Sequence, residues 1–219
     1  MELHSSRTTV LFVILLFALW TTAWLIHNLL AHTAWLAVGS SKNHDLIYWA
    51  SMKVLIWVVF PVSYAKTIMR VEELKTFLAI RNAGRGIVFG IVAGTIWIAA
   101  SYIFQGHFRF HFVWSFTLLW LLTGTPICEE FTFRGVILGG LQRSGMEFWP
   151  ANTITALLFL LIHFVGWTFQ GAFIHNFSLL VTGSIVLLGL ANGWLRFRSN
   201  SLYSCFILHS LNNLCASIS

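Results

Sequence analysis

Charged residues are scarce in this 219-residue chain: Asp, Glu, Lys and Arg together make up 9% of it, while 58% of the residues are hydrophobic. A soluble globular domain carries about 25% charged residues, so this composition excludes a soluble fold. The eleven Trp residues agree with that interpretation, because the indole ring favours the interface between a membrane and water. The sequence therefore predicts an all-α, polytopic bundle of transmembrane helices.

Cysteine is also scarce, and the sequence has no internal repeat, low-complexity tract or soluble domain. The three cysteines, Cys128, Cys205 and Cys215, lie in or beside apolar segments and have neither CxxC nor zinc-like spacing. This pattern indicates packing residues rather than a disulfide framework. We expect one integral-membrane domain, 1–219. Residues 1–110 would hold three spans and a cytoplasmic connector, and residues 111–219 would hold the chemically important motifs.

Seven apolar runs are each about 17–20 residues long, enough to cross about 30 Å of hydrocarbon at about 1.5 Å per residue. They predict seven spans, of which the fourth is open to continuation as far as Gly140. The spans cover residues 9–25, 46–64, 86–104, 111–130, 151–167, 175–194 and 201–218.

The basic residues predict the orientation of these spans. The formal net charge is +6, but the positive residues fall in short loops between apolar runs, so we expect no nucleic-acid partner. Positive loops mark the cytoplasmic side of a membrane protein. Ten of the thirteen Lys and Arg residues fall on the side of the N-terminus, which predicts a cytoplasmic N-terminus. The ten are Arg7, Lys66, Arg70, Lys75, Arg81, Arg85, Arg134, Arg143, Arg196 and Arg198; Lys42 and Arg109 lie opposite, and Lys53 lies within a span.

Glu129 and Glu130 are adjacent carboxylates at the end of the fourth apolar run. A charged side chain inside a bilayer costs on the order of 3 kcal/mol on insertion scales, so the pair has either a structural or a chemical role. On a helix, Glu130 and Arg134 are i,i+4 neighbours, which favours an ion pair. Glu129 projects about 100° away from Glu130 and is left to face a different partner.

Two histidines are expected at a comparable depth. His163 is about 12 residues, or roughly 18 Å, into the fifth span, and His209 is about eight residues, or roughly 12 Å, into the seventh. Both spans start on the predicted cytoplasmic side, so these groups can meet Glu129 in that half of the membrane. His209 and Asn213 are i,i+4 and can point at one ligand, for which Asn212 is the less favoured substitute.

The residue types suggest hydrolysis. A carboxylate beside an imidazole can take a proton from water, and a second imidazole with an amide can stabilise an oxyanion. This inventory fits cleavage of a peptide bond by activated water.

Three short motifs follow one another on the late spans: Glu-Glu-x-x-x-Arg at 129–134, Phe-x-x-x-His at 159–163 and His-x-x-x-Asn at 209–213. In this order they resemble the CPBP family of CAAX-prenyl-protease and bacteriocin-immunity-related intramembrane glutamic proteases. The resemblance covers about residues 111–219, and the first three spans carry no motif. The family also includes members with a role in immunity or scaffolding.

The resemblance implies a role for each motif position. Glu129 corresponds to the catalytic glutamate, which activates water together with His163. His209 and Asn213 correspond to the pair that stabilises the oxyanion.

Three further positions have supporting roles by the same resemblance. Glu130 and Arg134 are expected to pair and to orient Glu129. Phe159 is expected to position His163 by packing. No metal ion or other cofactor is expected.

Other chemistry is open to these residues. Glu129, His163 and His209 have the ligand types of a zinc site with one open position. Cys128 carries a thiol that a histidine base can activate, but a helical neighbour of Glu129 seldom shares its face. A third alternative is a proton-coupled carrier in which Glu129 and the histidines relay protons. Such a carrier would have inverted repeats or broken helices in paired positions, and the sequence has no such pairing. Lys53 is expected to extend toward an interface, with an acidic partner as the alternative.

The resulting hypothesis is an intramembrane glutamic endopeptidase, which hydrolyses a membrane-anchored or lipid-modified protein in a cavity open toward the cytoplasm. A prenylated CAAX tail is one candidate substrate, although no feature of the sequence recognises a prenyl group. The expected location is the plasma (inner) membrane of a prokaryote, with the bilayer as the second partner. The alternative is a non-proteolytic immunity or scaffold protein that retains the motif residues. The two functions differ in whether activity survives the loss of Glu129.

Overall fold

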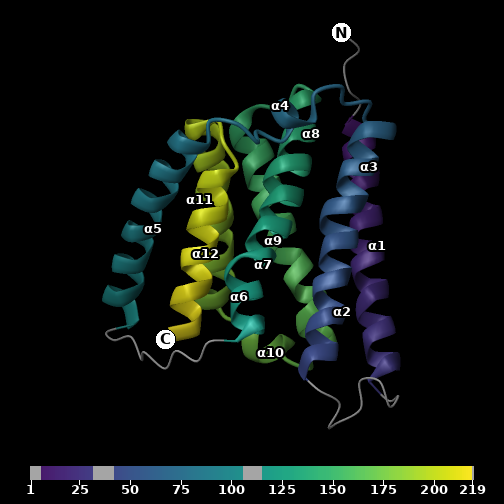
Figure 1. Ribbon diagram of the computed structural model, residues 1–219, viewed down its shortest axis with the longest axis vertical. Helices are drawn as coiled ribbons and strands as arrows, with labels where there is room; N and C mark the ends of the chain where they lie inside the picture. Colours follow the sequence, from purple (N-terminus) through teal and green to yellow (C-terminus); the bar gives the residue numbers. More distant parts are fainter. Residues whose placement is uncertain (1–5, 32–41, 106–114, 219) are drawn as a thin grey trace.

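The structure is a computed structural model that describes residues 6–31, 42–105 and 115–218. Within these ranges the chain forms helices and no β-strand, which confirms the predicted all-α fold. The long helices run side by side, with the N-terminus, α4 and α8 near one end of the bundle and α10 at the other (Figure 1). The elements are α1 (Ser6–Leu30), α2 (Lys42–Val54), η1 (Leu55–Val59), α3 (Phe60–Thr67), α4 (Leu74–Phe77), α5 (Ala83–Gln105), α6 (Phe116–Leu122), α7 (Gly124–Glu130), η2 (Phe131–Ile137), α8 (Leu138–Arg143), α9 (Phe148–Phe169), α10 (Phe173–Asn176), α11 (Leu179–Ser199) and α12 (Tyr203–Ile218).

Five helical stretches of the described chain are long and apolar enough to cross a membrane, and they overlap the predicted spans one, two, three, five and six. The predicted fourth span corresponds to a helix that is interrupted after Leu122, and the seventh to α12, which has only 16 residues. The number of spans and the orientation of the N-terminus remain predictions. The five stretches are Ser6–Leu30, His44–Thr67, Ala83–Phe104, Phe148–Phe169 and Leu179–Ser199.

The sixth span begins later than the apolar pattern predicted. Ser178 caps α11, because its side-chain oxygen accepts a hydrogen bond from the backbone N–H of Val181. Such a cap satisfies a free N–H group of the first turn and defines where the helix starts. His175, the predicted first residue of this span, lies in the short helix α10 instead.

The segment that carries the acidic pair is an interrupted helix from Phe116 to Arg143, preceded by the capping residue Ser115. It breaks between α6 and α7 at Thr123. Pro126 has no N–H for the carbonyl of Leu122 four residues earlier, which weakens the helix at this point. The helical segment then continues beyond Glu130 to Arg143. It therefore ends after Gly140, the last residue considered for the predicted fourth span. Residues 111–114 of the predicted span lie outside the described residues.

Two π-helical turns bring the helix of Lys53 against the helix of Glu129. The turn η1 follows Lys53 by two residues, and η2 begins directly after Glu130. Pro61 cannot donate to the carbonyl of Trp57, and the hydroxyl of Thr132 in η2 donates to that carbonyl at 2.5 Å. Turns of this kind are frequent at functional sites.

Small residues allow α5 to lie close to α12. Gly86, Gly90 and Gly94 face α12 at four-residue intervals. A Cβ atom at position 90 would lie 2.8 Å from the Cβ of Ile207 and 3.0 Å from the carbonyl oxygen of Ser204. In membranes, close helix packing of this kind depends on small residues because lipid gives no hydrophobic drive for association.

Substituting Gly90→Ala should therefore destabilise the protein, by about 1–3 kcal/mol for an overpacked contact. The matched control is Gly84→Ala on the same helix, where an added Cβ meets no atom within 4 Å. Alanine raises helix propensity at both positions, by at most about 1 kcal/mol, so the difference between the variants reports packing. Unfolding midpoints in detergent measure it, and equal midpoints would contradict the packing role.

Candidate active site

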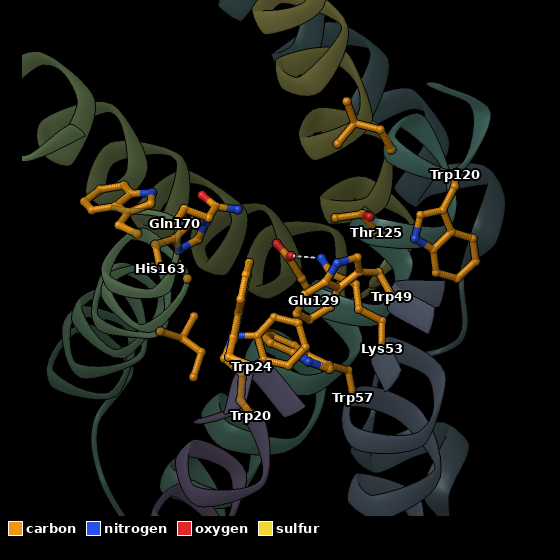
Figure 2. Close-up of a pocket in the computed structure, with 14 residues that line it drawn as sticks. Trp20, Trp24, Trp49, Lys53, Trp57, Trp120, Thr125, Glu129, His163 and Gln170 are labelled. Atoms are coloured by element: carbon orange, nitrogen blue, oxygen red, sulfur yellow. Dashed lines mark hydrogen bonds and ion pairs between the residues drawn. The ribbon is translucent and has the colours of Figure 1, made fainter. Parts of the chain in front are cut away.

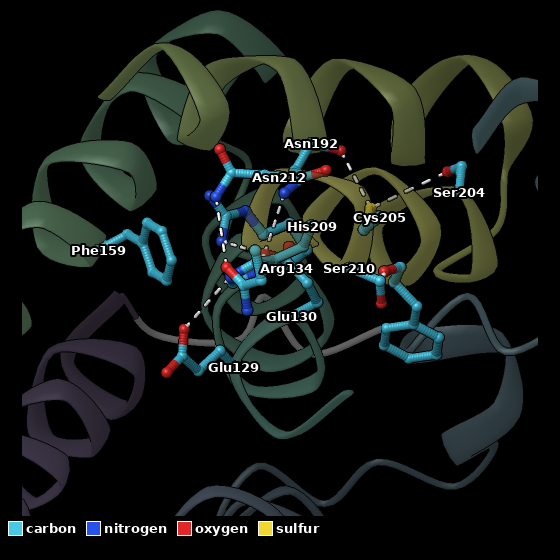
Figure 3. A network of polar contacts seen from close by, with 12 residues as sticks. Glu129, Glu130, Arg134, Phe159, Asn192, Ser204, Cys205, His209, Ser210 and Asn212 are labelled. Carbon is cyan, nitrogen blue, oxygen red and sulfur yellow. Dashed lines mark hydrogen bonds and ion pairs between the residues drawn. The ribbon is translucent and has the colours of Figure 1, made fainter. Parts of the chain in front are cut away.

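Glu130 is the centre of a buried polar network. It is 0% exposed, and three side chains donate to its Oε1 atom. The donors are Arg134 Nη1 at 3.0 Å, Asn192 Nδ2 at 3.0 Å and His209 Nδ1 at 2.7 Å (Figure 3). The ion pair predicted between Glu130 and Arg134 is therefore present. The network joins three segments of the chain that are distant in sequence: the acidic segment, α11 and α12.

Arg134 is fully buried as well, and apolar groups surround the rest of its side chain. Its guanidinium carbon lies 4.4 Å from the ring centroid of Phe159, a favourable cation–π geometry. Gly189 provides room for it, because a Cβ atom there would lie 3.1 Å from Nη2. Arg134 is consequently a buried helical residue and not, as the sequence analysis expected, a residue of a short loop.

Glu129 lies beside this network and has partners of its own. Lys53 forms an ion pair with Glu129 Oε1, and His209 Nε2 lies 3.7 Å from Glu129 Oε2. The side chains of Lys53 and Glu129 are 14% and 10% exposed. The expectation that Lys53 extends toward an interface is wrong, and its acidic partner is the predicted catalytic residue. His209 in turn contacts both glutamates, one with each ring nitrogen.

His163 is oriented by its own helix. Its Nδ1 atom lies 2.6 Å from the carbonyl oxygen of Phe159. A carbonyl oxygen only accepts hydrogen bonds, so Nδ1 carries the proton and Nε2 keeps its lone pair. The ring of Phe159 packs edge-on against that of His163, with centroids 4.9 Å apart. Phe159 therefore holds His163 through both its backbone and its ring.

Glu129, His163 and Lys53 line one cavity of about 330 Å³ (Figure 2). Its wall is mainly aromatic, and six of the eleven tryptophans contribute to it: Trp20, Trp24, Trp49, Trp57, Trp120 and Trp167.

The lining residues come from the second half of α1, from α2 and η1, from α6, from α7, which carries Glu129, and from the end of α9. The cavity thus lies in the half of the bundle nearer α10, away from the N-terminus (Figure 1). This differs from the expectation of a cavity in the half that holds the N-terminus.

Asn213 is not brought to the glutamates. Its Nδ2 donates to the carbonyl of Leu121 at 2.9 Å, next to the interruption between α6 and α7. Leu121 lines the cavity, so Asn213 lies behind that portion of the wall. Asn212 accepts a hydrogen bond from Trp97 Nε1 at 3.0 Å and donates to Asn213 Oδ1 at 3.3 Å, so its amide has other partners as well.

Sequence reasoning overlooked Asn192 and favoured an interface position for Lys53 over the acidic partner that it kept as the alternative. Both carried a usable signal, since an amide or an ammonium group inside an apolar span is costly without a partner. The sequence does not identify the partner, because the partner lies on a helix that is distant in the chain.

The remaining alternatives find no support in the geometry. In the described residues, no group of three or more His, Cys, Asp and Glu side chains has the arrangement of a metal site. Cys128 is buried but is not among the residues that line the cavity. All three cysteines are buried and free of disulfides, as expected for packing residues.

Comparison with known proteins adds the family. Residues 109–215 match the family model described as type II CAAX prenyl endopeptidase Rce1-like. This segment, just under half of the chain, belongs to the CPBP family. It is thus related to membrane proteases, and the five long apolar helices of the described residues agree with an integral membrane location. The comparisons with curated proteins and with solved structures gave no match. The matched range contains the three motifs but not Lys53 or the tryptophans of α1 and α2.

Removing Arg134 should destabilise the core of the protein. Arg134→Met leaves the fully buried Glu130 without its cation, and breaking a buried pair in this way costs about 3–5 kcal/mol. The control is Arg143→Met, which removes the same charge from an exposed position on the same helical segment. Detergent-solubilised variants are compared by their unfolding midpoints. A midpoint for Arg134→Met equal to that of the control would show that the pair contributes little to stability.

Proposed function

We propose that this protein is an intramembrane endopeptidase in which Glu129 and His163 activate water against a peptide bond. The observation that carries the proposal is that Glu129 and His163 line the same cavity, in a chain whose family comprises CAAX prenyl endopeptidases. The substrate is a membrane-anchored or lipid-modified protein segment. The location that we propose is the inner membrane of a prokaryote.

The reaction proceeds by attack of water on the carbonyl carbon. Among the described residues, Glu129 and His163 form no ion pair within 4.0 Å, and both line the cavity; in the proposed reaction the attacking water lies between the carboxylate and the Nε2 atom of His163. Glu129 takes one proton as the oxygen attacks, and this proton passes to the leaving amine when the C–N bond breaks. The surrounding tryptophans limit the water around the carboxylate, which strengthens its interactions with charged and polar groups.

The neighbouring groups hold Glu129 in position. Lys53 binds one carboxylate oxygen and His209 faces the other, while Glu130 keeps His209 in place through Nδ1. The role of His209 and Asn213 in stabilising the oxyanion, which the family resemblance implies, stays a prediction. For Asn213 it requires release of the carbonyl of Leu121, to which its amide is bonded.

Substituting Glu129→Gln removes the base but keeps the shape of the side chain. Cleavage should fall by about 10²–10⁴-fold, the usual contribution of a general base. The substrate is found by comparing N-terminal and C-terminal peptides of membrane fractions from cells with wild-type or variant protein. The cleavage rate is then measured on the accumulated species.

Two further variants make this test specific. Glu147→Gln changes an exposed carboxylate in the loop before α9 and should leave the peptide profile unchanged. Glu130→Gln changes the structural carboxylate and should lower stability as well as activity. If a folded Glu129→Gln protein at normal abundance leaves the profile untouched, hydrolysis is rejected and the scaffold function takes its place.

Lys53 should act as a positioning residue. Lys53→Met removes the cation that holds Glu129, and displacement of a catalytic group by about 1 Å can cost about 100-fold in rate. We expect a lower kcat with little change in KM, and partial recovery in Lys53→Arg. Lys66→Met, an exposed lysine later in the same helical stretch, is the control. A kcat for Lys53→Met equal to that of the control would show that the ion pair has no role in the reaction.

A further inference from the structure

A second cavity, of about 470 Å³, lies between α4, α5, α8 and α11. Three arginines line it: Arg85, Arg196 and Arg198. The helices α4 and α8 lie at the end of the bundle that holds the N-terminus, so this cavity is remote from the tryptophan-lined one (Figure 1). Among the described residues, these arginines donate hydrogen bonds only to uncharged acceptors. The positive charge of the cavity is therefore not balanced by these bonds.

No described carboxylate lies within 4.0 Å of any of the three guanidinium groups. Glu73 is near the cavity, but its side chain accepts a hydrogen bond from Thr76 at 3.1 Å instead. Guanidinium groups that converge on one cavity repel one another unless an anion lies between them. The described residues therefore leave a concentrated positive charge without a counter-ion.

Arg196 is the innermost of the three. Its Nη1 donates to Gln142 Oε1 at 2.9 Å and its Nη2 to the carbonyl of Phe77 at 3.1 Å. These neutral acceptors hold the side chain in place without balancing its charge. Its Nε atom is buried and has no hydrogen-bond partner among the described residues. A buried donor without a partner is costly, so the arrangement is incomplete as it stands.

The other two arginines are exposed and complete the rim. Arg85 Nη2 donates to the backbone carbonyl of Arg198 at 2.8 Å, which places the Arg85 side chain against the backbone of α11 at the cavity. The guanidinium of Arg198 lies 6.0 Å from the ring centroid of Trp194. Trp194 and Phe197 are 42% and 54% exposed, as aromatic residues are where a helix leaves the hydrocarbon region.

We propose that this arginine cavity binds a phosphate group. The guanidinium fork matches the geometry of phosphate oxygens and forms charge-assisted hydrogen bonds with them. The source is either the headgroup of an anionic phospholipid or a free phosphate ion. The aromatic rim favours the headgroup, because a phospholipid at this height places its phosphate beside the arginines and its acyl chains against the apolar helices. The site is independent of the proposed protease function.

The test measures binding, not catalysis. Purified protein in detergent is titrated with phosphatidylglycerol, with phosphatidylcholine of the same acyl chains, and separately with inorganic phosphate. Bound lipid is counted by native mass spectrometry, and binding of inorganic phosphate is followed by the unfolding midpoint. The double variant Arg85→Gln/Arg198→Gln is used because both side chains are exposed and neither belongs to the core. Arg196→Lys tests the innermost position while keeping its charge.

We expect the double variant to bind phosphatidylglycerol about tenfold more weakly than the wild type, as the loss of a hydrogen bond to a charged group implies. The control Arg143→Gln removes an exposed charge outside the cavity and should change binding by about twofold or less. If inorganic phosphate raises the unfolding midpoint of the wild type but not that of the double variant, the site binds a free phosphate ion. If the double variant and Arg143→Gln bind both phosphatidylglycerol and inorganic phosphate equally well, the proposal is overturned. The arginines would then only reflect the excess of positive residues on one side of the membrane.

Discussion

The buried contact between Glu130 and Arg134 is the interaction on which the rest of the structure depends. Both side chains are fully buried, and in that environment neither charge is tolerated without the other. The carboxylate also collects an amide from α11 and an imidazole from α12, so three distant segments of the chain converge on one oxygen atom. His209 is held by this oxygen and then faces Glu129. Glu130 thus contacts Glu129 indirectly, through His209.

The first spans complete the site that the motif-bearing half begins. Lys53 reaches Glu129 from α2, and tryptophans of α1 and α2 form much of the cavity wall. None of these residues belongs to the range that matches the family model. The carbonyl of Trp57 in the π-helical turn η1, which the following Pro61 leaves without its usual donor, accepts the hydrogen bond from Thr132 and ties this helix to the acidic segment. The first half of the chain therefore supplies the cation and much of the aromatic wall that surround Glu129 and His163.

The two cavities occupy opposite ends of the bundle, and α11 connects their surroundings. Asn192 of this helix donates to Glu130, and Arg196, one turn later, lines the arginine cavity. A phosphate group bound there would neutralise charge at the end of the helix that supports the glutamate network. The tryptophan-lined cavity combines a carboxylate, an imidazole and an ammonium group, whereas the charged groups of the arginine cavity are all donors. The first suits a reaction and the second suits binding.

The sequence by itself determined the membrane class, most of the apolar spans, the pairing of Glu130 with Arg134 and the motif residues. These features follow from composition and from spacing along one helix, where neighbours three or four residues apart always meet. Only the tertiary structure decided that Lys53 binds Glu129, that Asn192 supports Glu130, that Asn213 faces Leu121 and that the cavity lies away from the N-terminus. Those contacts join residues on different helices. Their rotation and depth depend on local features that hydropathy does not encode, such as the break at Thr123 ahead of Pro126, the π-helical turn η1 ahead of Pro61 and the cap at Ser178.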